Sequence, residues 1–337
     1  MADFGTVDPA FAADYLHPNV GANREDVLLD PAHGGDVGAV RVGDSAVAMA
    51  TDPVVLAPSL GLERAAWFAV HVLLSDVAVA GIPPAHLSID LTLPPAMTDE
   101  AFATVWETVD AEATEFGVSI TTGHTGRYAG CDYPMVGAGT AIGVGDLDAL
   151  VRPDGARVGD RVVVTTGPAV AATALLATLF ADRLRGAVSE DEFAAATERF
   201  RDQTVVRDAL TAAAAGPVTA MHGATEGGVY GALTALGRAA AVGVEISQDR
   251  VPVQPGVDAT CAVFGIDPWT ALSVGTLVLS VDPAGVDQIL DALAAEGVPA
   301  ADVGEVVDGS GLTVDGETVE PPDCDRFWTT IEEDAVL

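Results

Sequence analysis

The sequence predicts two domains, each of which combines β-strands with α-helices in an α/β or α+β arrangement. With 337 residues, 49% of them hydrophobic, the chain is long enough to fill more than one core. Strand-like alternation and helical spacing of apolar residues follow one another in both halves. The segment VRPDGARVGD, residues 151–160, concentrates Pro, Gly and charged residues between them. We therefore expect an N-terminal domain over residues 1–150 and a C-terminal domain over 151–337.

The first half is predicted to begin with two strands around a turn at Gly43-Asp44, in AVRVGDSAVAMATD. Residues 63–82 place apolar side chains at helical spacing, which predicts a largely buried helix. HLSIDLTLP alternates as a strand. TDEAFATVWETVDAEATEFG is amphipathic, and we expect this helix to start after an N-cap at Thr98 and to stop at Gly117. VSITTG and MVGAGTAIGVG then predict two strands joined by a polar connection.

The second half repeats this mixture of elements. VVVTTG predicts a strand, residues 169–184 predict an alanine-rich helix, and a charged helix is expected from Ser189. PVTAMHGATEGGVYGALTALGRAAAVGVEI predicts a strand, a glycine turn, a helix and a further strand. The remaining chain predicts a strand at VGTLVLSV, a helix over residues 284–296, and strands near 301–319.

The charge balance is extreme, with 50 acidic residues, 15 basic residues and a net charge of −35. Every basic residue is an arginine. The acidic residues are scattered along the chain. This distribution favours the interpretation that the acidity is an adaptation of a halophilic microbe to high salt, rather than a surface for one specific cationic partner. Because no cluster of basic residues is present, the sequence argues against binding to nucleic acid.

The sequence also bears on the compartment of the protein. It shows no basic segment followed by an apolar one at the N-terminus, and no uncharged apolar run of membrane-spanning length. The three cysteines, at 131, 261 and 324, do not predict a disulfide framework. We therefore expect a cytoplasmic protein that does not enter a membrane.

Three aspartates at the ends of predicted strands or within a predicted helix are candidate metal ligands: Asp36, Asp52 and Asp76. Asp76 lies in the apolar segment LLSDVAVAG, where a buried carboxylate is costly unless it is paired or bound to a metal. Carboxylates that converge from separate elements are typical of Mg²⁺ sites on phosphate substrates. The alternative is that these side chains cap turns or pair with arginines.

A glycine turn, Thr225-Glu226-Gly227-Gly228, opens a predicted helix. Backbone N–H groups at a helix N-terminus favour a phosphate, and glycine allows it to approach closely. The turn is not a Walker A loop, because the chain contains no lysine. Ordinary turn chemistry remains the alternative.

A polar cluster lies in TTGHTGRYAGCDYPMVGAGTAIG, from Thr121 to Gly143. His124 and Cys131 fit no zinc-ligand spacing, and nothing in the sequence marks Cys131 as an activated nucleophile. Arg127, with Tyr128 beside it, suits the recognition of a phosphate or of another part of a substrate. The pattern predicts a binding role for the cluster.

Six segments occur in the same order as in one superfamily: GGDVGAV, TDPVVLAP, LLSDVAVAGIPPAHLSIDL, TTGHT, HGATEGGVYGAL and FGIDPWTALSVGTLV. Together they resemble the aminoimidazole ribonucleotide (AIR) synthase, or PurM-like, superfamily, over roughly residues 20–320. That group includes HypE, thiamine-monophosphate kinase and selenophosphate synthetase. The sequence is most similar to archaeal HypE-like, AIR synthase-related proteins.

This resemblance implies an N-terminal α/β domain whose strands form a β-barrel in a homodimer, and a C-terminal α+β domain. It implies ATP in the cleft between the domains, with Mg²⁺ on its phosphates. Residue by residue, the resemblance assigns metal or phosphate contacts to the three aspartates, and nucleotide contacts to the glycine turn and to the TTGHT segment. It assigns the polar cluster a role at the phosphate or at the second substrate. The cluster is therefore expected to face that cleft. The residues are Asp36, Asp52 and Asp76 for the metal; Asp36, Thr125, Thr225, Gly227 and Gly228 for the nucleotide; and His124 and Arg127 for catalysis.

The chain departs from the family pattern at three places. His124 stands where the GDT motif has an aspartate, and Gly223 stands where the D-x-T-x-G-G motif begins with an aspartate. The loss of these two carboxylates implies fewer metal ligands, or a metal that is held differently. HypE ends in a cysteine that receives the carbamoyl group, whereas Cys324 lies thirteen residues before the end of this sequence.

The function implied is ATP-dependent activation of an oxygen atom in a small-molecule, carbamoyl or amide acceptor by phosphoryl transfer, as in HypE. Such catalysis consists largely of positioning and charge neutralisation. Two alternatives stay open: a nucleotide-binding maturation or regulatory protein without turnover, which would act on a protein partner, and a kinase similar to thiamine-monophosphate kinase.

Overall fold

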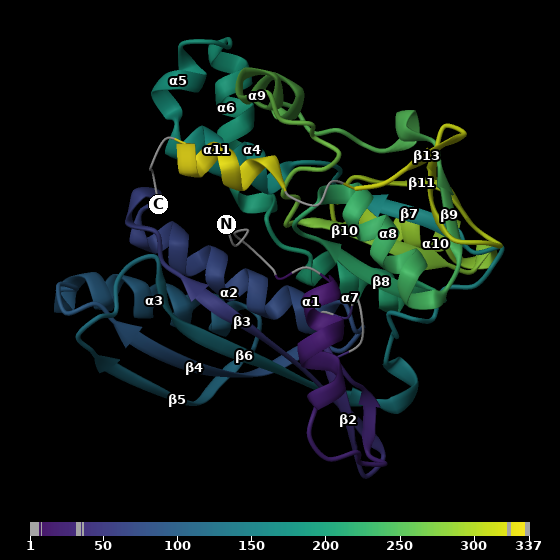
Figure 1. The fold of residues 1–337 in the computed structure, drawn as a ribbon, viewed down its shortest axis with the longest axis horizontal. Helices are drawn as coiled ribbons and strands as arrows, with labels where there is room; N and C mark the ends of the chain where they lie inside the picture. The colour runs from purple at the N-terminus through teal and green to yellow at the C-terminus, as the bar shows by residue number, and fades with distance from the viewer. Residues whose placement is uncertain (1–6, 8, 32–34, 36, 322–324, 334–337) are drawn as a thin grey trace.

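The computed structural model describes residues 7, 9–31, 35, 37–321 and 325–333. The chain forms two β-sheets, one of six strands from the first half and one of seven from the second. Figure 1 shows the first sheet at the bottom of the molecule, the second at the upper right, and two long helices between the first sheet and the C-terminal half. The predicted combination of strands and helices in both halves is confirmed.

The N-terminal sheet has the strand order β1-β2-β3-β6-β4-β5. β4 and β5 run parallel, whereas the other neighbouring pairs are antiparallel. Two long helices make the connections from β3 to β4 and from β4 to β5, and both lie on the same face of the sheet. The bounds are β1 (Val27–Leu29), β2 (Gly38–Val42), β3 (Ser45–Val55), α2 (Leu62–Ala78), β4 (Pro84–Leu93), α3 (Asp99–Glu115), β5 (Ser119–Arg127) and β6 (Met135–Asp146), with the short elements α1 (Pro9–Phe11), η1 (Ala12–Leu16), η2 (His17–Asn19), η3 (Pro58–Leu60) and η4 (Leu147–Ala149).

Local sequence signals account for several of these bounds. The Thr98 hydroxyl accepts a hydrogen bond from the Ala101 N–H at 3.1 Å, which caps α3 as predicted. Gly117, with φ at +68°, follows the end of the same helix. α2 ends at Ala78, four residues before the predicted end, because the chain turns at Gly81, where φ is +70°.

Glycines in β6 allow α2 to lie close to the sheet. A Cβ atom on Gly139 would lie 2.4 Å from a Leu73 methyl group, and one on Gly143 would lie 2.8 Å from Val77. Any larger residue at these positions would push the helix away from the strand. Close packing of the helix therefore explains the glycines at positions 139 and 143.

The C-terminal sheet has the order β13-β12-β9-β11-β7-β10-β8, in which only the neighbours β9 and β12 run parallel. Its elements follow the predicted sequence, with additional helices between them. The bounds are β7 (Arg161–Thr165), α4 (Val170–Leu179), α5 (Ala181–Arg185), α6 (Glu190–Glu198), η5 (Arg199–Asp202), α7 (Val206–Ala215), β8 (Val218–Ala224), α8 (Gly228–Ala240), β9 (Gly243–Ile246), η6 (Gln248–Arg250), α9 (Val257–Phe264), β10 (Thr276–Val281), η7 (Pro283–Gly285), α10 (Val286–Ala295), β11 (Ala300–Val307), β12 (Gly311–Val314), β13 (Glu317–Val319) and α11 (Arg326–Glu333).

One predicted helix is split. Residues 169–184 form α4 and α5, with a break at Phe180, whose φ of −121° and ψ of 39° are not helical. The Phe180 ring packs on Phe264 of α9, with the ring centroids 5.5 Å apart. Tertiary packing is thus associated with a break that the continuous alanine-rich pattern does not predict.

Both faces of the C-terminal sheet are covered. Val163, Leu277 and Leu279 point to the face that holds α7 and α10, in a core that continues into α2 and the N-terminal sheet. Val164 and Val278 point to the other face, where α8 packs. A third core joins α4, α6, α9 and α11 to Trp67 of α2. The two halves therefore share buried apolar surface rather than touching only through a linker.

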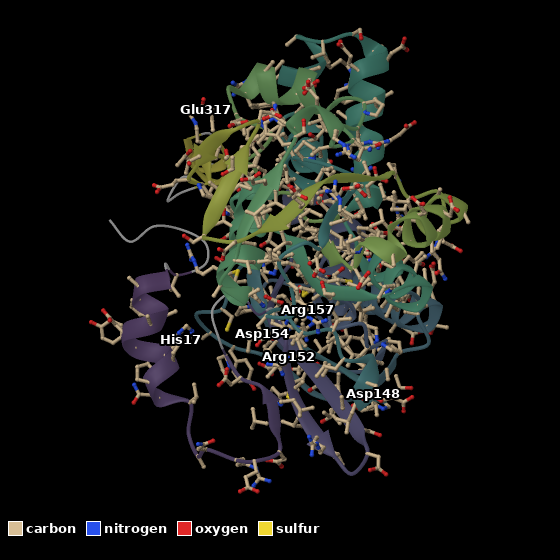
Figure 2. The ribbon with its side chains drawn as sticks, turned by 90° about the vertical axis from the view of Figure 1, so that its right-hand side faces the viewer. His17, Asp148, Arg152, Asp154, Arg157 and Glu317 are labelled. Atoms are coloured by element: carbon tan, nitrogen blue, oxygen red, sulfur yellow. The ribbon has the colours of Figure 1, made fainter. Side chains whose placement is uncertain are left out.

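The segment between the two sheets runs over residues 147–160. Arg152 donates a hydrogen bond from Nε to Asp154 at 2.7 Å and one from Nη1 to the Leu28 carbonyl at 2.9 Å, which ties the segment to β1. Figure 2 shows Arg152, Asp154 and Arg157 where the N-terminal strands meet the C-terminal half. No helix within the described part of the chain is long and apolar enough to span a membrane.

Candidate functional site

The predicted phosphate turn lies between the end of β8 and the start of α8. Gly227 and Gly228 both have positive φ, at +74° and +63°, which glycine adopts without the strain of a Cβ atom. A Cβ on Gly228 would lie 2.6 Å from the Trp269 carbonyl oxygen, so this position also requires glycine on packing grounds. The Gly228 N–H donates to the Thr225 carbonyl at 3.2 Å, and the Thr225 side chain is exposed.

The Gly227 N–H donates to a carboxylate oxygen of Asp325 at 3.3 Å. Asp325 precedes α11, is 6% exposed, and accepts a second hydrogen bond from the Phe327 N–H at 2.9 Å. Burial raises the pKa of its carboxyl group to about 6. The N-terminus of α8 therefore already binds an anionic group, which shows that its donors suit one.

The adjacent side chains strengthen this contact. Trp328 Nε1 donates to the Glu226 carboxylate at 3.1 Å, so two residues of the C-terminal segment hydrogen-bond to the same turn. Asp325 is absent from the prediction because 98 residues separate it from Gly227. The only local pattern that points to Asp325 is its place two residues before Phe327, at the start of the short helix α11.

Asp52 and Asp76 lie in the same region of the N-terminal domain. Asp52 in β3 is paired with Gly139 in β6, and paired residues point to the same face of a sheet. A Cβ on Gly139 would meet Leu73 of α2, so Asp52 is on the face that α2 covers. Asp76 follows Leu73 by three residues, about one turn of the helix. Both carboxylate side chains are intermediate in exposure.

The described residues do not form a complete metal site. Asp36, the third predicted ligand, lies outside the described residues. Among the residues that the structure describes, no group of three or more His, Cys, Asp or Glu side chains is placed to hold a metal ion. At Gly223, where the family motif has an aspartate, a Cβ would meet nothing within 4 Å. The magnesium assignment remains a prediction.

The polar cluster is not only a connection between strands. β5 extends through His124, Thr125 and Arg127, and only residues 128–134 connect it to β6. β5 forms part of the sheet beyond the predicted end because it pairs in parallel with β4 as far as Leu93. β5 is also the edge strand, so most of its residues are exposed.

His124 points away from the cleft between the two halves. It pairs with the exposed Asp90, between the buried Ile89 and Leu91, so it occupies the face of the sheet that α2 and α3 do not cover. Its Nε2 atom lies 2.5 Å from the hydroxyl of Tyr128. Within one chain, the expectation that this cluster faces the cleft is wrong for His124, because strand alternation directs it to the opposite face. Thr125 and Arg127 pair with the buried Leu91 and Leu93 and lie on the covered face.

Arg127 is held by residues at the start of α3 and just before it. Its Nη2 atom lies 2.7 Å from the Asp99 carboxylate and donates to the Met97 carbonyl at 3.3 Å. The ion pair is exposed, which makes it weak. Cys131 and Cys261 are free thiols, and burial raises the pKa of Cys261 to about 12, so this thiol is unreactive. Cys324 lies outside the described residues.

A cavity of about 480 Å³ lies between the two halves on the other side of α2. Its described lining includes Trp67 and His71 and contains none of the residues predicted to bind nucleotide or metal. Asp76 follows Trp67 by nine residues, about half a turn around the helix axis, so the aspartate and the cavity lie on different sides of α2. The cavity is within the usual size range of small-molecule sites.

The side chains of this cavity pair largely with one another. Arg207 of α7 binds Glu115 of α3 at 2.8 Å, and His71 Nε2 lies 3.0 Å from Glu112. Burial lowers the pKa of His71, so the neutral ring that donates to Glu112 is favoured. These contacts join α2, α3 and α7.

Asp208 is the most buried acid of the cavity lining, at 6% exposure. It accepts a hydrogen bond from the Thr165 hydroxyl at 2.9 Å, and burial raises its pKa to about 6. Thr166, next in the chain, has a φ of +59° and also lines the cavity. A perturbed carboxyl group and a strained backbone in one pocket are typical of functional sites. No local pattern in the sequence marks either residue.

The family assignment follows from comparison with known proteins. The model for the N-terminal domain of AIR synthase-related proteins matches residues 34–144, and the model for their C-terminal domain matches residues 157–317. The chain belongs to the AIR synthase-related family. The resemblance predicted from six short segments is confirmed.

Within the AIR synthase-related family, the chain is 28% identical over 292 residues to a protein named carbamoyl dehydratase HypE from Bradyrhizobium diazoefficiens, covering 82% of this chain and 79% of that one. The crystal structure of Escherichia coli HypE, a hydrogenase maturation protein, superposes with a TM-score of 0.71 at 25% identity, covering 83% and 86% of the chains.

Two further structures share the fold of this AIR synthase-related protein. A HypE solved in complex with ATP has a TM-score of 0.64 at 20% identity, with 92% of each chain covered. Thiamine-monophosphate kinase from Aquifex aeolicus has a TM-score of 0.68 at 20% identity, covering 85% of this chain and 93% of the other. The fold is therefore the two-domain PurM-like fold.

Proposed function

We propose that this AIR synthase-related protein binds ATP between its two domains and uses it to activate an oxygen atom of a small-molecule, carbamoyl or amide acceptor, as a HypE-like enzyme. The observation that carries the proposal is the turn at Gly227-Gly228, whose backbone amide already holds a carboxylate at the N-terminus of α8. The named HypE relatives and the fold shared with an ATP-bound HypE support the same function.

In this proposal, the Gly227 N–H donates a hydrogen bond to a phosphate oxygen of the nucleotide, and the exposed Thr225 hydroxyl lies beside it. Asp52 and Asp76, with Asp36, hold Mg²⁺ on the phosphates. The metal neutralises phosphate charge during transfer to the acceptor oxygen. The protein residues contribute mainly by positioning the groups and by excluding water, because phosphoryl transfer requires little covalent participation from side chains.

The proposed role of His124 depends on a second copy of the chain. His124 lies on the uncovered face of the N-terminal sheet, together with half-buried Val47, Met49 and Ile142, and with Val144, which is 45% exposed. An uncovered sheet face with apolar side chains favours pairing with another sheet. We propose a homodimer through this face, in which the partner brings its own cleft towards the cluster.

Light scattering in molar KCl is expected to give the mass of a dimer at micromolar concentration. Val144→Glu places a charge on the uncovered face and should shift the protein to monomer. Val158→Glu is the matched control, because Val158 is 58% exposed in the segment between the sheets. A monomer mass for the unchanged protein, or an intact dimer in Val144→Glu, would contradict the proposed interface.

Calorimetric titration with Mg-ATP in molar KCl, followed by hydrolysis assays with a panel of acceptors, tests the function itself. Gly228→Ala should weaken ATP binding at least tenfold, because the new methyl group would meet the Trp269 carbonyl oxygen. Gly265→Ala is the control for backbone strain. It has a similar φ of +66°, with nothing within 4 Å of its Cβ, at the end of α9.

The acceptor panel separates the alternatives. A HypE-like enzyme transfers the γ-phosphoryl group to the acceptor oxygen, so it forms ADP and releases phosphate only with a carbamoyl or amide acceptor. Turnover with thiamine monophosphate would instead identify a kinase, which the shared fold with thiamine-monophosphate kinase makes the second candidate. Tight binding without turnover on any acceptor would identify a nucleotide-binding maturation or regulatory protein, and absence of binding would reject the proposal.

A further inference from the structure

The C-terminal segment Asp325–Ile331 ends on the turn to which the proposed function assigns the phosphate. Asp325 binds the Gly227 N–H, and Trp328 binds Glu226 through its indole N–H. Phe327 and Ile331 are 1% and 3% exposed, in the core formed with α4, α6 and α9. Figure 1 shows α11, in yellow, beside α4. The segment is therefore a docked part of the fold, and its carboxylate is directed at the turn by this packing.

We propose that Asp325 is an internal competitor of the nucleotide phosphate, so that ATP binding requires this carboxylate to leave the Gly227 amide. The inference rests on the proposed function. The N–H group of Gly227 points to one acceptor site, which the Asp325 carboxylate occupies. Two unit negative charges about 4 Å apart repel each other by about 4 kcal/mol at a partly buried site, so both anions cannot share the donor without a bridging cation.

Two features indicate that the carboxylate can be displaced without loss of the fold. The bond to Gly227, at 3.3 Å, is longer than the bond to Phe327, at 2.9 Å, so the weaker contact is the one with the turn. The docking energy of the segment comes from Phe327 and Ile331, whose burial does not depend on Asp325. Rotation of one side chain therefore opens the phosphate position while α11 stays in place.

The coupling is reciprocal. If Asp325 lowers the affinity for ATP, bound ATP must weaken the contact of Asp325 with the turn by the same factor. The amide of Phe327, which donates to the other carboxylate oxygen, should then exchange its hydrogen faster when ATP is bound. A purely structural cap of α11 predicts no change in this exchange rate.

The variants Asp325→Ala and Asp325→Asn test the inference, with ATP and adenosine as the two probes in calorimetric titrations. Asn removes the charge but retains an acceptor for the Phe327 N–H, so it controls for damage to the start of α11. Asp282→Ala is the matched control. Asp282 accepts from the N–H two residues on, at 2.9 Å, in the same way. It follows the end of β10 and so lies at the opposite end of the β8–β10 strand pair from the turn.

We expect both Asp325 variants to bind ATP at least tenfold more tightly than the parent. Their affinity for adenosine, which has no phosphate, should be unchanged. The ATP affinity of Asp282→Ala should also equal that of the parent. Equal ATP affinity in the parent and the Asp325 variants would overturn the inference but leave the proposed function intact. Weaker ATP binding would show that Asp325 is a ligand of the bound nucleotide or its metal, which also overturns it. If neither the parent nor the variants bind ATP, the proposed function fails, and the inference fails with it.

Discussion

Asp208→Asn is expected to stabilise the folded protein by about 2–3 kcal/mol at pH 8. Asp208 is 6% exposed, and burial raises the pKa of its carboxyl group from the ordinary value of 3.8 to about 6. At pH 8 the carboxyl group is ionised in both folded and unfolded states, so folding includes the cost of burying its charge. A shift of two pKa units corresponds to about 3 kcal/mol. Asn removes the charge and still accepts the hydrogen bond from Thr165.

The effect has a defined dependence on pH. Because the folded-state pKa is the higher one, the folded protein binds the proton more tightly, and this group contributes stability below about pH 4. That contribution to stability is lost as the pH rises from about 4 to about 6, and it is absent at every pH above about 6. The stability difference between Asp208→Asn and the parent should therefore be smallest near pH 4 and reach its full value above pH 6.

Chemical denaturation at several pH values, in constant molar KCl, measures this difference. Asp110→Asn is the matched control, because it removes one negative charge from the exposed face of α3. The control matters in a chain with a net charge of −35, in which removal of any acid relieves some repulsion. A flat difference across pH 4–8, or an equal gain in the control, would contradict the burial argument. A loss of stability would show that the ionised carboxylate is bound by a cationic group in solution.

Asp76→Asn is expected to lower the affinity for Mg-ATP at least tenfold, which corresponds to about 1.4 kcal/mol, while leaving the fold intact. Asp76 is half-buried on α2, one turn beyond the place where Leu73 packs on β6 next to Asp52. An ionised carboxylate in this setting favours a cation, and Mg²⁺ on the nucleotide supplies one. Asn keeps the shape of the side chain and removes the charge.

A comparison of titrations with and without Mg²⁺, together with a thermal melt, separates binding from stability. The loss of affinity should appear only with the metal, and Asp148→Asn, at an exposed position labelled in Figure 2, should bind Mg-ATP like the parent. A lower melting temperature with unchanged ATP affinity would mean that Asp76 forms a structural contact instead. Unchanged affinity and stability would remove it from the site.

The sequence determined the features that depend on neighbours along the chain. The turn at Gly43-Asp44, the N-cap at Thr98 and the opening of α8 at Gly227-Gly228 are local, because each depends on backbone conformation or hydrogen bonds within a few residues. The order of six short segments was also sufficient to predict the family, since their sequence and spacing do not require knowledge of the contacts.

Only the tertiary structure decided which of these groups meet. The direction of His124 depends on the pairing of β5 with β4, in which a shift by one residue reverses the face of every side chain. Asp325 reaches Gly227 because Phe327 and Ile331 dock in a core built from distant helices. Asp208 has a raised pKa because the packing of both halves buries it, and its own segment of sequence gives no sign of that burial. Burial and contacts between remote residues are properties of the packed chain, which local patterns do not encode.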